Sequence, residues 1–161
     1  MTTVTLDDLD LRILSTLQAD ASISNLELSR RVHASAPTCL RRVRALRDAG
    51  VIARQIAILE PSKLGPTLTA VVEVSLDRQT AEDFDAFESY ICAESAVTQC
   101  YRVSPGPDFV VIAQVRDMAE YDGLARRLFK GASNIRNVRT FFSTRMAKFE
   151  ANARVQMNRP H

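Results

Sequence analysis

The chain has 161 residues, of which 46% are hydrophobic and 25% are charged, an ordinary globular composition that argues against a disordered or fibrous protein. The net charge of +2 is too small to indicate a partner by itself. No stretch approaches the roughly 18 apolar residues needed to cross a bilayer. The first residues have neither the basic region nor the apolar core of a secretion signal, so we expect a cytoplasmic protein.

The residue types that carry most catalytic and metal chemistry are scarce. There are three cysteines and two histidines, and the absence of a C-x-x-C pair argues against a disulfide framework and a zinc knuckle. The five glycines form none of the usual phosphate-binding loops. We therefore expect no cofactor and no metal. Cys39, Cys92 and Cys100 are interpreted as packing residues, with redox sensing as the alternative for the last two.

The first 55 residues predict three short helices. Apolar residues recur at helical spacing over 6–17, with aspartates in the first turn. Ser24 and Ser35 stand where the N-caps of a second and a third helix belong. Gly50 is a typical residue to end the third helix. With two short strands expected within 52–59, this region has the pattern of a winged helix-turn-helix.

A different pattern follows the breaker-rich run at 61–66. Apolar–polar alternation predicts strands at 68–76, 97–103, 109–115 and 135–146, and helical spacing predicts helices around 84–91 and 118–128. The order β-α-β-β-α-β is that of a ferredoxin-like unit, so the fold class is α+β. The expected domains are 1–60 and 68–161, with a hinge at 61–67. A single sheet of this kind leaves one face and its edges open, so we expect at least a homodimer.

Positive charge is concentrated in the third predicted helix. Residues 1–55 hold eight arginines and six acids, whereas 56–161 hold 13 basic and 13 acidic residues. At 100° per residue, an apolar arc comprises Ala36, Cys39, Leu40, Val43 and Leu46. The opposite arc comprises Pro37, Thr38, Arg41, Arg44, Ala45 and Asp48, with Arg42 beside it. A short helix with small residues and arginines outward suits the major groove of DNA. The alternative is an ordinary solvated face.

Several short motifs stand in order along the chain. In the first domain they are DDLDLRIL (7–14), ISNLEL (23–28), APTCLRRV (36–43) and AGVI (49–52); in the second they are LG (64–65), VEV (72–74), DF (108–109), VRDM (115–118) and TF (140–141). In residue type and spacing they resemble the Lrp/AsnC family, the leucine-responsive or feast/famine regulators. The resemblance implies a DNA-binding winged helix-turn-helix and an amino-acid-binding domain. It also implies dimers that often assemble into octamers, with effectors held between dimers.

Candidate sites follow from the arcs, the chemistry of a free amino acid and the resemblance. For DNA they are Ser35, Pro37, Thr38, Arg41, Arg42 and Arg44. For the effector they are Ser104, Gly106, Asp108, Met118, Thr140, Phe141, Phe142 and Ser143. Asp108 would accept the ammonium group, and Ser104 and Gly106 would offer amides to the carboxylate. The resemblance assigns effector roles to Asp108, Met118 and the last-strand positions. Alternatively, Asp108 caps its turn, and Met118, Phe141 and Phe142 are core residues.

The leading interpretation is a sequence-specific DNA-binding transcriptional regulator controlled by a small amino acid or a related metabolite. One alternative is an architectural DNA-binding protein whose second domain only oligomerises. Another is a small metabolic enzyme that uses the ferredoxin-like domain. The sequence shows no nucleophile–base pair, metal cluster or cofactor loop for such an enzyme.

Overall fold

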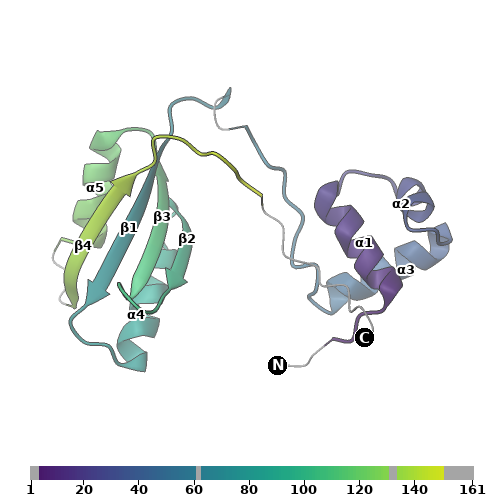
Figure 1. Cartoon of the computed structure of the whole chain (residues 1–161), viewed down its shortest axis with the longest axis horizontal. Helices are drawn as coiled ribbons and strands as arrows, with labels where there is room; N and C mark the ends of the chain where they lie inside the picture. The colour runs from purple at the N-terminus through teal and green to yellow at the C-terminus, as the bar shows by residue number, and fades with distance from the viewer. Residues whose placement is uncertain (1–3, 61–62, 131–133, 151–161) are drawn as a thin grey trace. The chain divides into compact units, whose positions relative to one another are not determined.

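A computed structural model describes residues 4–60, 63–130 and 134–150 of the chain (Figure 1). The chain divides into two compact units. In the described residues, the first unit comprises 4–58 together with Phe149 and Glu150. The second unit comprises Leu59–Lys148. Pro61 and Ser62, which belong to the predicted hinge, lie outside the described residues, as do residues 151–161 of the predicted second domain.

The first unit contains three helices in its described residues, as predicted: α1 (Asp8–Ala19), α2 (Asn25–Arg31) and α3 (Ala36–Asp48). The N-caps Ser24 and Ser35 are confirmed, because each hydroxyl accepts a hydrogen bond from a backbone N–H three residues on. Gly50 has a φ of +71°, a left-handed conformation that glycine adopts without strain and that ends α3 as predicted.

A small apolar core holds these helices together. Ile13 of α1, Val32 after α2 and Cys39 of α3 are fully buried, and Leu28, Val43 and Leu46 pack around them. Leu40 was predicted to face this core, but its side chain is 55% exposed. The reason is helical geometry: Leu40 is turned 100° away from Cys39, beyond the line of Cys39, Val43 and Leu46 that meets the other helices.

The two strands predicted within 52–59 are not formed. The backbone there is without regular structure, and Ile56, Ile58 and Leu59 are all more than half exposed. A strand needs the N–H and C=O groups of a second strand. Within the described residues, no other segment pairs with this one. The alternating apolar pattern alone could not supply that partner.

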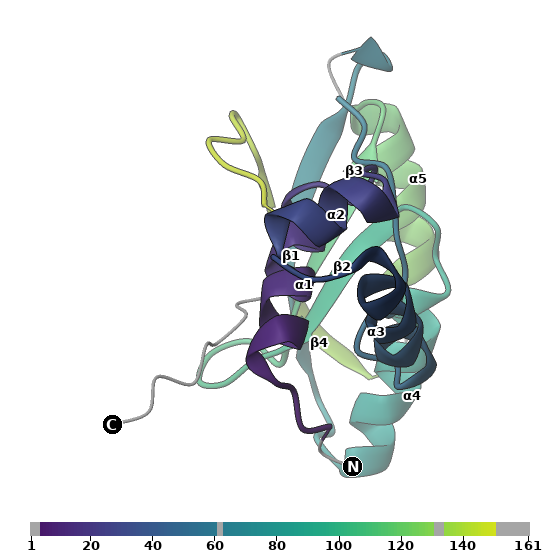
Figure 2. The same ribbon diagram turned by 90° about the vertical axis from the view of Figure 1, so that its right-hand side faces the viewer.

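The second unit is a sheet of four strands in its described residues, with order β2-β3-β1-β4 and every neighbouring pair antiparallel. Its elements are β1 (Leu68–Leu76), α4 (Ala81–Cys92), β2 (Val97–Arg102), β3 (Phe109–Val115), α5 (Met118–Leu128) and β4 (Ile135–Phe142). The predicted β-α-β-β-α-β order is confirmed. Both helices lie on the same face of the sheet (Figures 1 and 2).

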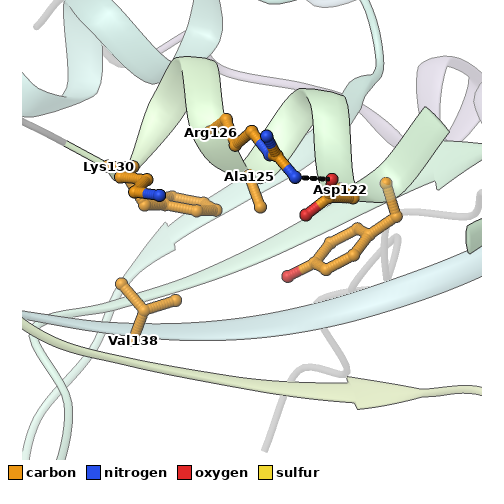
Figure 3. A pocket seen from close by; sticks show the side chains of 7 residues that line it. Asp122, Ala125, Arg126, Lys130 and Val138 are labelled. Atoms are coloured by element: carbon orange, nitrogen blue, oxygen red, sulfur yellow. Dashed lines mark ion pairs between the residues drawn. The ribbon is translucent and has the colours of Figure 1, made fainter. Parts of the chain in front are cut away.

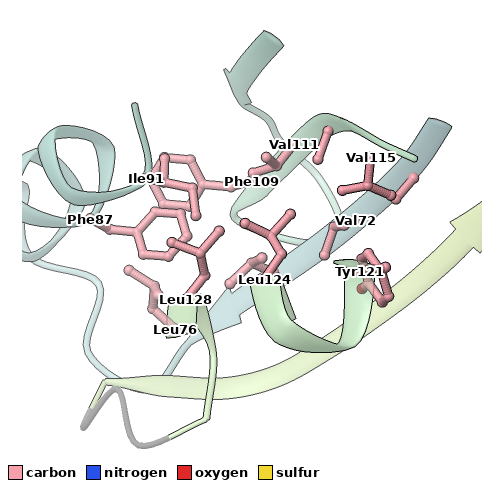
Figure 4. Close-up of a cluster of buried hydrophobic side chains, with 13 residues drawn as sticks. Val72, Leu76, Phe87, Ile91, Phe109, Val111, Val115, Tyr121, Leu124 and Leu128 are labelled. Atoms are coloured by element: carbon pink, nitrogen blue, oxygen red, sulfur yellow. The ribbon is translucent and has the colours of Figure 1, made fainter. Parts of the chain in front are cut away.

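Alternation along the strands gives this sheet two unlike faces. The face under α4 and α5 holds the core, in which Val72, Phe109 and Leu124 are almost completely buried (Figure 4). The other face, called the open face below, carries in the same strands Val71, Glu73, Val110, Ile112, Tyr101, Arg139 and Phe141. In register across three strands, Ile112 pairs with Val71 and Val71 pairs with Phe141. No helix of the second unit covers the open face within the described residues (Figures 1 and 2).

The last strand is shorter than predicted. It was expected to continue to Met146, but β4 ends at Phe142. The N–H of Ser143 donates to the carbonyl of Thr69 (2.9 Å), near the beginning of β1. Pro66 lies two residues before β1 and has no backbone N–H, so β1 does not extend back to it. Beyond Phe142, β4 therefore has no strand to pair with.

A charged contact fixes α3 against the start of α1. Arg42 Nη2 lies 2.7 Å from Asp7 Oδ2, and Arg42 Nη1 lies 3.2 Å from Asp10 Oδ2. The side chain of Asp10 is 8% exposed and that of Arg42 is 31% exposed. Asp7 and Asp10 also form the capping box of α1, with each carboxylate accepting the other residue's backbone N–H. One guanidinium therefore holds two helices together.

We predict that Arg42→Ala lowers the free energy of unfolding by about 1–3 kcal/mol, because it leaves the nearly buried Asp10 carboxylate without its charged partner. Arg41→Ala, the same change one residue away on an exposed position, is the matched control and should stay within about 0.5 kcal/mol of the wild type. Urea denaturation followed by circular dichroism measures both variants. Equal midpoints for the two would contradict the assigned role of Arg42.

Candidate functional site

The outward face of α3 carries the two arginines that are free to bind a ligand. Arg41 and Arg44 are exposed, as are Pro37 and Ala45 beside them. Within the described part of the chain, neither guanidinium has a hydrogen bond or an ion pair. Arg47, also exposed, donates to Gln55 Oε1 (2.9 Å). The structure therefore brings Pro37, Arg41 and Arg44 together on one surface, as the helical arc predicted.

Ser35 and Thr38 lie at the beginning of the same helix. The Ser35 hydroxyl accepts from the N–H of Thr38 (3.3 Å), and the two hydroxyls are 2.8 Å apart. Ser35 therefore caps α3 and orients Thr38 at the N-terminal end of the helix. That end carries partial positive charge and unpaired backbone N–H groups, which favour phosphate.

Arg42 was predicted to contact DNA, and the structure gives it a different role. Its guanidinium is engaged by Asp7 and Asp10 of the first helix, so it holds α3 in place and is not free to reach a base edge. The pKa of the Asp7 carboxyl is lowered, chiefly by the hydrogen bond from the Asp10 backbone and further by Arg42. The Asp7 carboxylate is thus favoured as an ionised partner of the arginine.

The turn between α2 and α3 depends on His33, for which the sequence suggested a surface or turn role, with a phosphate contact as the alternative. His33 has a φ of +53°, in the left-handed region that is uncommon for residues other than glycine. Its backbone N–H donates to Arg30 O (3.3 Å), and that of Ala34 donates to Ser29 O (3.0 Å). Asn25 Nδ2 donates to Ala36 O (2.8 Å). These bonds set the angle at which α3 leaves α2, and no glycine at this position signalled the turn.

The first group of predicted effector residues lies around the β2–β3 turn. Ser104 and Gly106 are in the turn, and Asp108 precedes β3. The Asp108 carboxylate accepts hydrogen bonds from the backbone N–H of Leu76 (2.7 Å) and from Gln79 Nε2 (2.9 Å). It therefore caps the end of the neighbouring strand β1 and not its own turn. This acceptor role was not predicted, because Leu76 is 32 residues away in sequence.

The second group lies around the end of β4 and the start of α5. Met118 is 54% exposed and Phe141, on the open face, is 48% exposed, so neither is a core residue. Phe142 does pack against the core, with its ring edge-to-face on Tyr121 at a centroid distance of 4.9 Å. The Thr140 hydroxyl is hydrogen-bonded to that of Tyr121. Tyr121 was not among the predicted site residues, since its helical spacing indicated only a core position.

One chain does not bring these two groups together. The N–H of Asp108 bonds to Val74 O, whereas that of Ser143 bonds to Thr69 O. These carbonyls are five residues apart on β1, which at about 3.3 Å per residue separates the groups by roughly 17 Å. In addition, Phe141 lies on the open face and Phe142 on the helix-covered face. The predicted effector residues therefore do not line a single pocket of the monomer.

An open cavity of about 360 Å³ lies near the second group, between α5 and the edge strand β4 (Figure 3). Ala125, Phe129 and Val138 give it an apolar lining, and Tyr121 closes one part of it. At the rim, Arg126 pairs with Asp122 (2.6 Å). The cavity contains Tyr121 but none of the eight predicted effector residues.

We predict that Asp108→Ala lowers the stability of the second unit by about 1–3 kcal/mol, because the buried Leu76 N–H loses its acceptor. Asp108→Asn keeps a carbonyl oxygen for that N–H and should lose clearly less. Thermal denaturation monitored by circular dichroism separates the two variants. If Asp108→Ala melts together with Asp108→Asn, the carboxylate does not support the end of β1 in the way described.

In the described residues, no group of three or more His, Cys, Asp or Glu side chains is placed to hold a metal ion. None of the helices in the described ranges combines the length and apolar character that a membrane span requires.

Comparisons with known proteins agree with both units. A sequence profile for winged helix-turn-helix DNA-binding domains matches residues 6–53, and one for the Lrp/AsnC ligand binding domain matches residues 69–152. A leucine-responsive regulatory protein of Rhizobium meliloti is 37% identical over 145 residues, covering 90% of this chain and 93% of that protein. An uncharacterised HTH-type transcriptional regulator of Haemophilus influenzae is 35% identical over 147 residues, covering 91% of this chain and 88% of the relative.

Solved structures give the same result. An AsnC family transcriptional regulator from Agrobacterium tumefaciens has a TM-score of 0.86 at 28% identity, covering 93% of this chain and 97% of its own. A transcriptional regulator from Neisseria meningitidis in complex with L-Met has a TM-score of 0.85 at 26% identity, covering 94% and 97%. With both domains matched over almost the whole length, the chain belongs to the Lrp/AsnC family of transcriptional regulators, with an N-terminal helix-turn-helix DNA-binding domain and a C-terminal ligand-binding domain.

Proposed function

We propose that α3 reads DNA in the major groove through Arg41 and Arg44, with Ser35, Pro37 and Thr38 at its N-terminal end against the backbone. The observation that carries this proposal is the difference among the arginines of α3. Arg42 is held by two aspartates and Arg47 by Gln55, whereas Arg41 and Arg44 are exposed without a partner in the described residues. Arginine can form a bidentate hydrogen bond with a guanine edge, and phosphate neutralisation adds salt-dependent affinity.

The functional unit is proposed to be a homodimer in which the open faces of two sheets meet. Val71, Ile112 and Phe141 form an apolar row across three strands of this face. Tyr101 on β2 is 52% exposed beside it. A second copy would remove this surface from water and would present two α3 helices to half-sites about one helical turn apart. Assembly of such dimers into octamers is part of the proposal.

The proposed effector is a small amino acid or a related metabolite. The Neisseria meningitidis relative in complex with L-Met supports this ligand class. In one chain the two groups of candidate residues lie at opposite ends of the sheet, so a complete site would take Asp108 and the turn from one copy and Met118, Thr140 and Ser143 from another. Binding between copies would couple ligand to assembly, and assembly to DNA affinity.

This assignment favours a cytoplasmic regulator over an enzyme. Asp108, the one carboxylate among the candidate effector residues, is already used as a hydrogen-bond acceptor for Leu76 and Gln79. Such a carboxylate can hold an ammonium group, and no nucleophile is aligned with it in the described contacts. The architectural alternative would leave the second domain without a ligand, and a ligand screen distinguishes the two.

We predict that Arg41→Ala weakens binding to a selected duplex by about 1–3 kcal/mol and relaxes its base preference. The duplex is obtained by enriching randomised DNA on the wild-type protein, and affinity is measured by gel-shift titration at several salt concentrations. Arg126→Ala, which removes an exposed arginine of α5, is the control and should bind as the wild type does. If Arg41→Ala and Arg44→Ala both bind like this control, α3 is not the reading helix.

We also predict that one or a few of the twenty amino acids raise the melting temperature of the wild-type protein by several degrees. At a ligand concentration of about 100 times Kd the stabilisation is about 2.7 kcal/mol. Asp108→Asn should lose this rise, because it keeps the hydrogen bond to Leu76 but not the charge that attracts an ammonium group. A protein that binds the selected DNA but responds to none of the amino acids would support the architectural alternative.

A further inference from the structure

Two cysteines of the second unit lie on facing elements. Cys100 is on β2 and pairs across the sheet with Val111, a residue of the helix-covered face, so its side chain lies on the side where α4 packs. Cys92 is the last residue of α4 and is exposed. Both thiols are free. The expectation that both are packing residues is correct in part for Cys100 and wrong for Cys92.

Two ion pairs of Arg102 fix the register of α4 against β2. Arg102 Nε lies 2.8 Å from Glu88 Oε1, and Arg102 Nη2 lies 2.8 Å from Asp85 Oδ1. Cys100 is two residues before Arg102 on the same side of β2, about 7 Å along the strand. Cys92 is four residues after Glu88 on α4, about 6 Å along the helix. Because the chain reverses between α4 and β2, these two steps run in the same direction and place Cys92 opposite Cys100.

The electrostatic surroundings of Cys100 agree with this placement. The pKa of the Cys100 thiol is raised to about 11, chiefly by burial and also by the neighbouring Cys92 side chain. Glu88 acts in the same direction and Arg102 opposes it. Cys100 is therefore a poor first nucleophile, whereas Cys92 is the thiol that solvent and small molecules reach first.

We propose that Cys92 and Cys100 are a redox modification site, at which a low-molecular-weight disulfide converts the two thiols into a reversible disulfide between α4 and β2. The Cys92 thiolate attacks one sulfur of the small disulfide, forming a mixed disulfide and releasing one small thiolate. Cys100 then loses its proton and attacks Sγ of Cys92, releasing the second small thiol. Two cysteine thiols are oxidised and one small disulfide is reduced to two thiols, so atoms and electrons balance.

The site is separate from the surfaces assigned above. α4 and the helix-covered side of β2 lie opposite the open face, so the proposed dimer leaves Cys92 accessible. The third cysteine, Cys39, is fully buried in the first unit, and burial raises the pKa of its thiol. It therefore serves as an internal standard that should not react.

The chain offers a direct measurement. No lysine or arginine lies between Gln79 and Arg102, so one tryptic peptide carries both Cys92 and Cys100, and Cys39 falls in another. The reduced full-length protein is incubated with glutathione disulfide, and its remaining free thiols are blocked with an alkylating reagent. The protein is then digested with trypsin, and the peptide masses are measured by mass spectrometry. The wild type and Cys39→Ala should yield this peptide two hydrogens lighter and unalkylated, and dithiothreitol should restore it.

Single variants test the order of the two steps. Cys100→Ser should stop at a glutathione adduct on Cys92, and Cys92→Ser should remain unmodified under the same conditions. The proposal is overturned if both cysteines of the wild type stay open to alkylation, if each carries its own glutathione, or if Cys92 links two chains. Because Cys92 is exposed, Cys92→Ser should melt like the wild type, which keeps the comparison free of unfolding.

Discussion

The contact between Arg42 and the two aspartates at the start of α1 determines which face of α3 the first unit exposes. It fixes the rotation of α3 about its own axis, since Arg42 has to point at Asp7 and Asp10. Arg41 and Arg44 are 60° apart on the helix, and this rotation leaves both in solvent. The apolar contacts of Cys39, Val43 and Leu46 with the other helices favour the same rotation. The orientation of the exposed face that carries Arg41 and Arg44 therefore results from a structural ion pair on the flank of the helix.

In the second unit the pleat of the sheet decides which side chains are buried and which are exposed. Successive residues of a strand point to opposite faces, so the core under α4 and α5 and the open face are built from the same four strands. Phe142 packs in one and Phe141 lies on the other. The antiparallel pairing also carries the β2–β3 turn and the end of β4 to opposite ends of β1. Residues at these two ends therefore cannot line one site within a single copy.

The three chemistries of the chain occupy different surfaces. Arg41 and Arg44 lie on the first unit, the apolar row of the open face lies on one side of the sheet, and Cys92 and Cys100 lie on the other. None of these groups competes with another for the same neighbours. The proposed DNA binding, pairing of copies and thiol oxidation can therefore be tested one at a time by substitution.

The sequence by itself determined the elements whose signals are local. The bounds of β1 and β3, the caps at Ser24 and Ser35 and the end of α3 at Gly50 follow from alternation, hydrogen-bonding side chains and backbone freedom, all of which depend on a few neighbouring residues. The motifs of the Lrp/AsnC family and the exposed positions of Arg41 and Arg44 were readable for the same reason.

Only the tertiary structure decided which distant groups meet. It set Arg42 against Asp10, 32 residues away, and Asp108 against the N–H of Leu76, also 32 residues away. It left the segment within 52–59 without a strand partner, ended β4 where β1 begins and brought Cys92 over Cys100. Each of these outcomes depends on what lies across from a residue in space, and spacing along the chain does not carry that information.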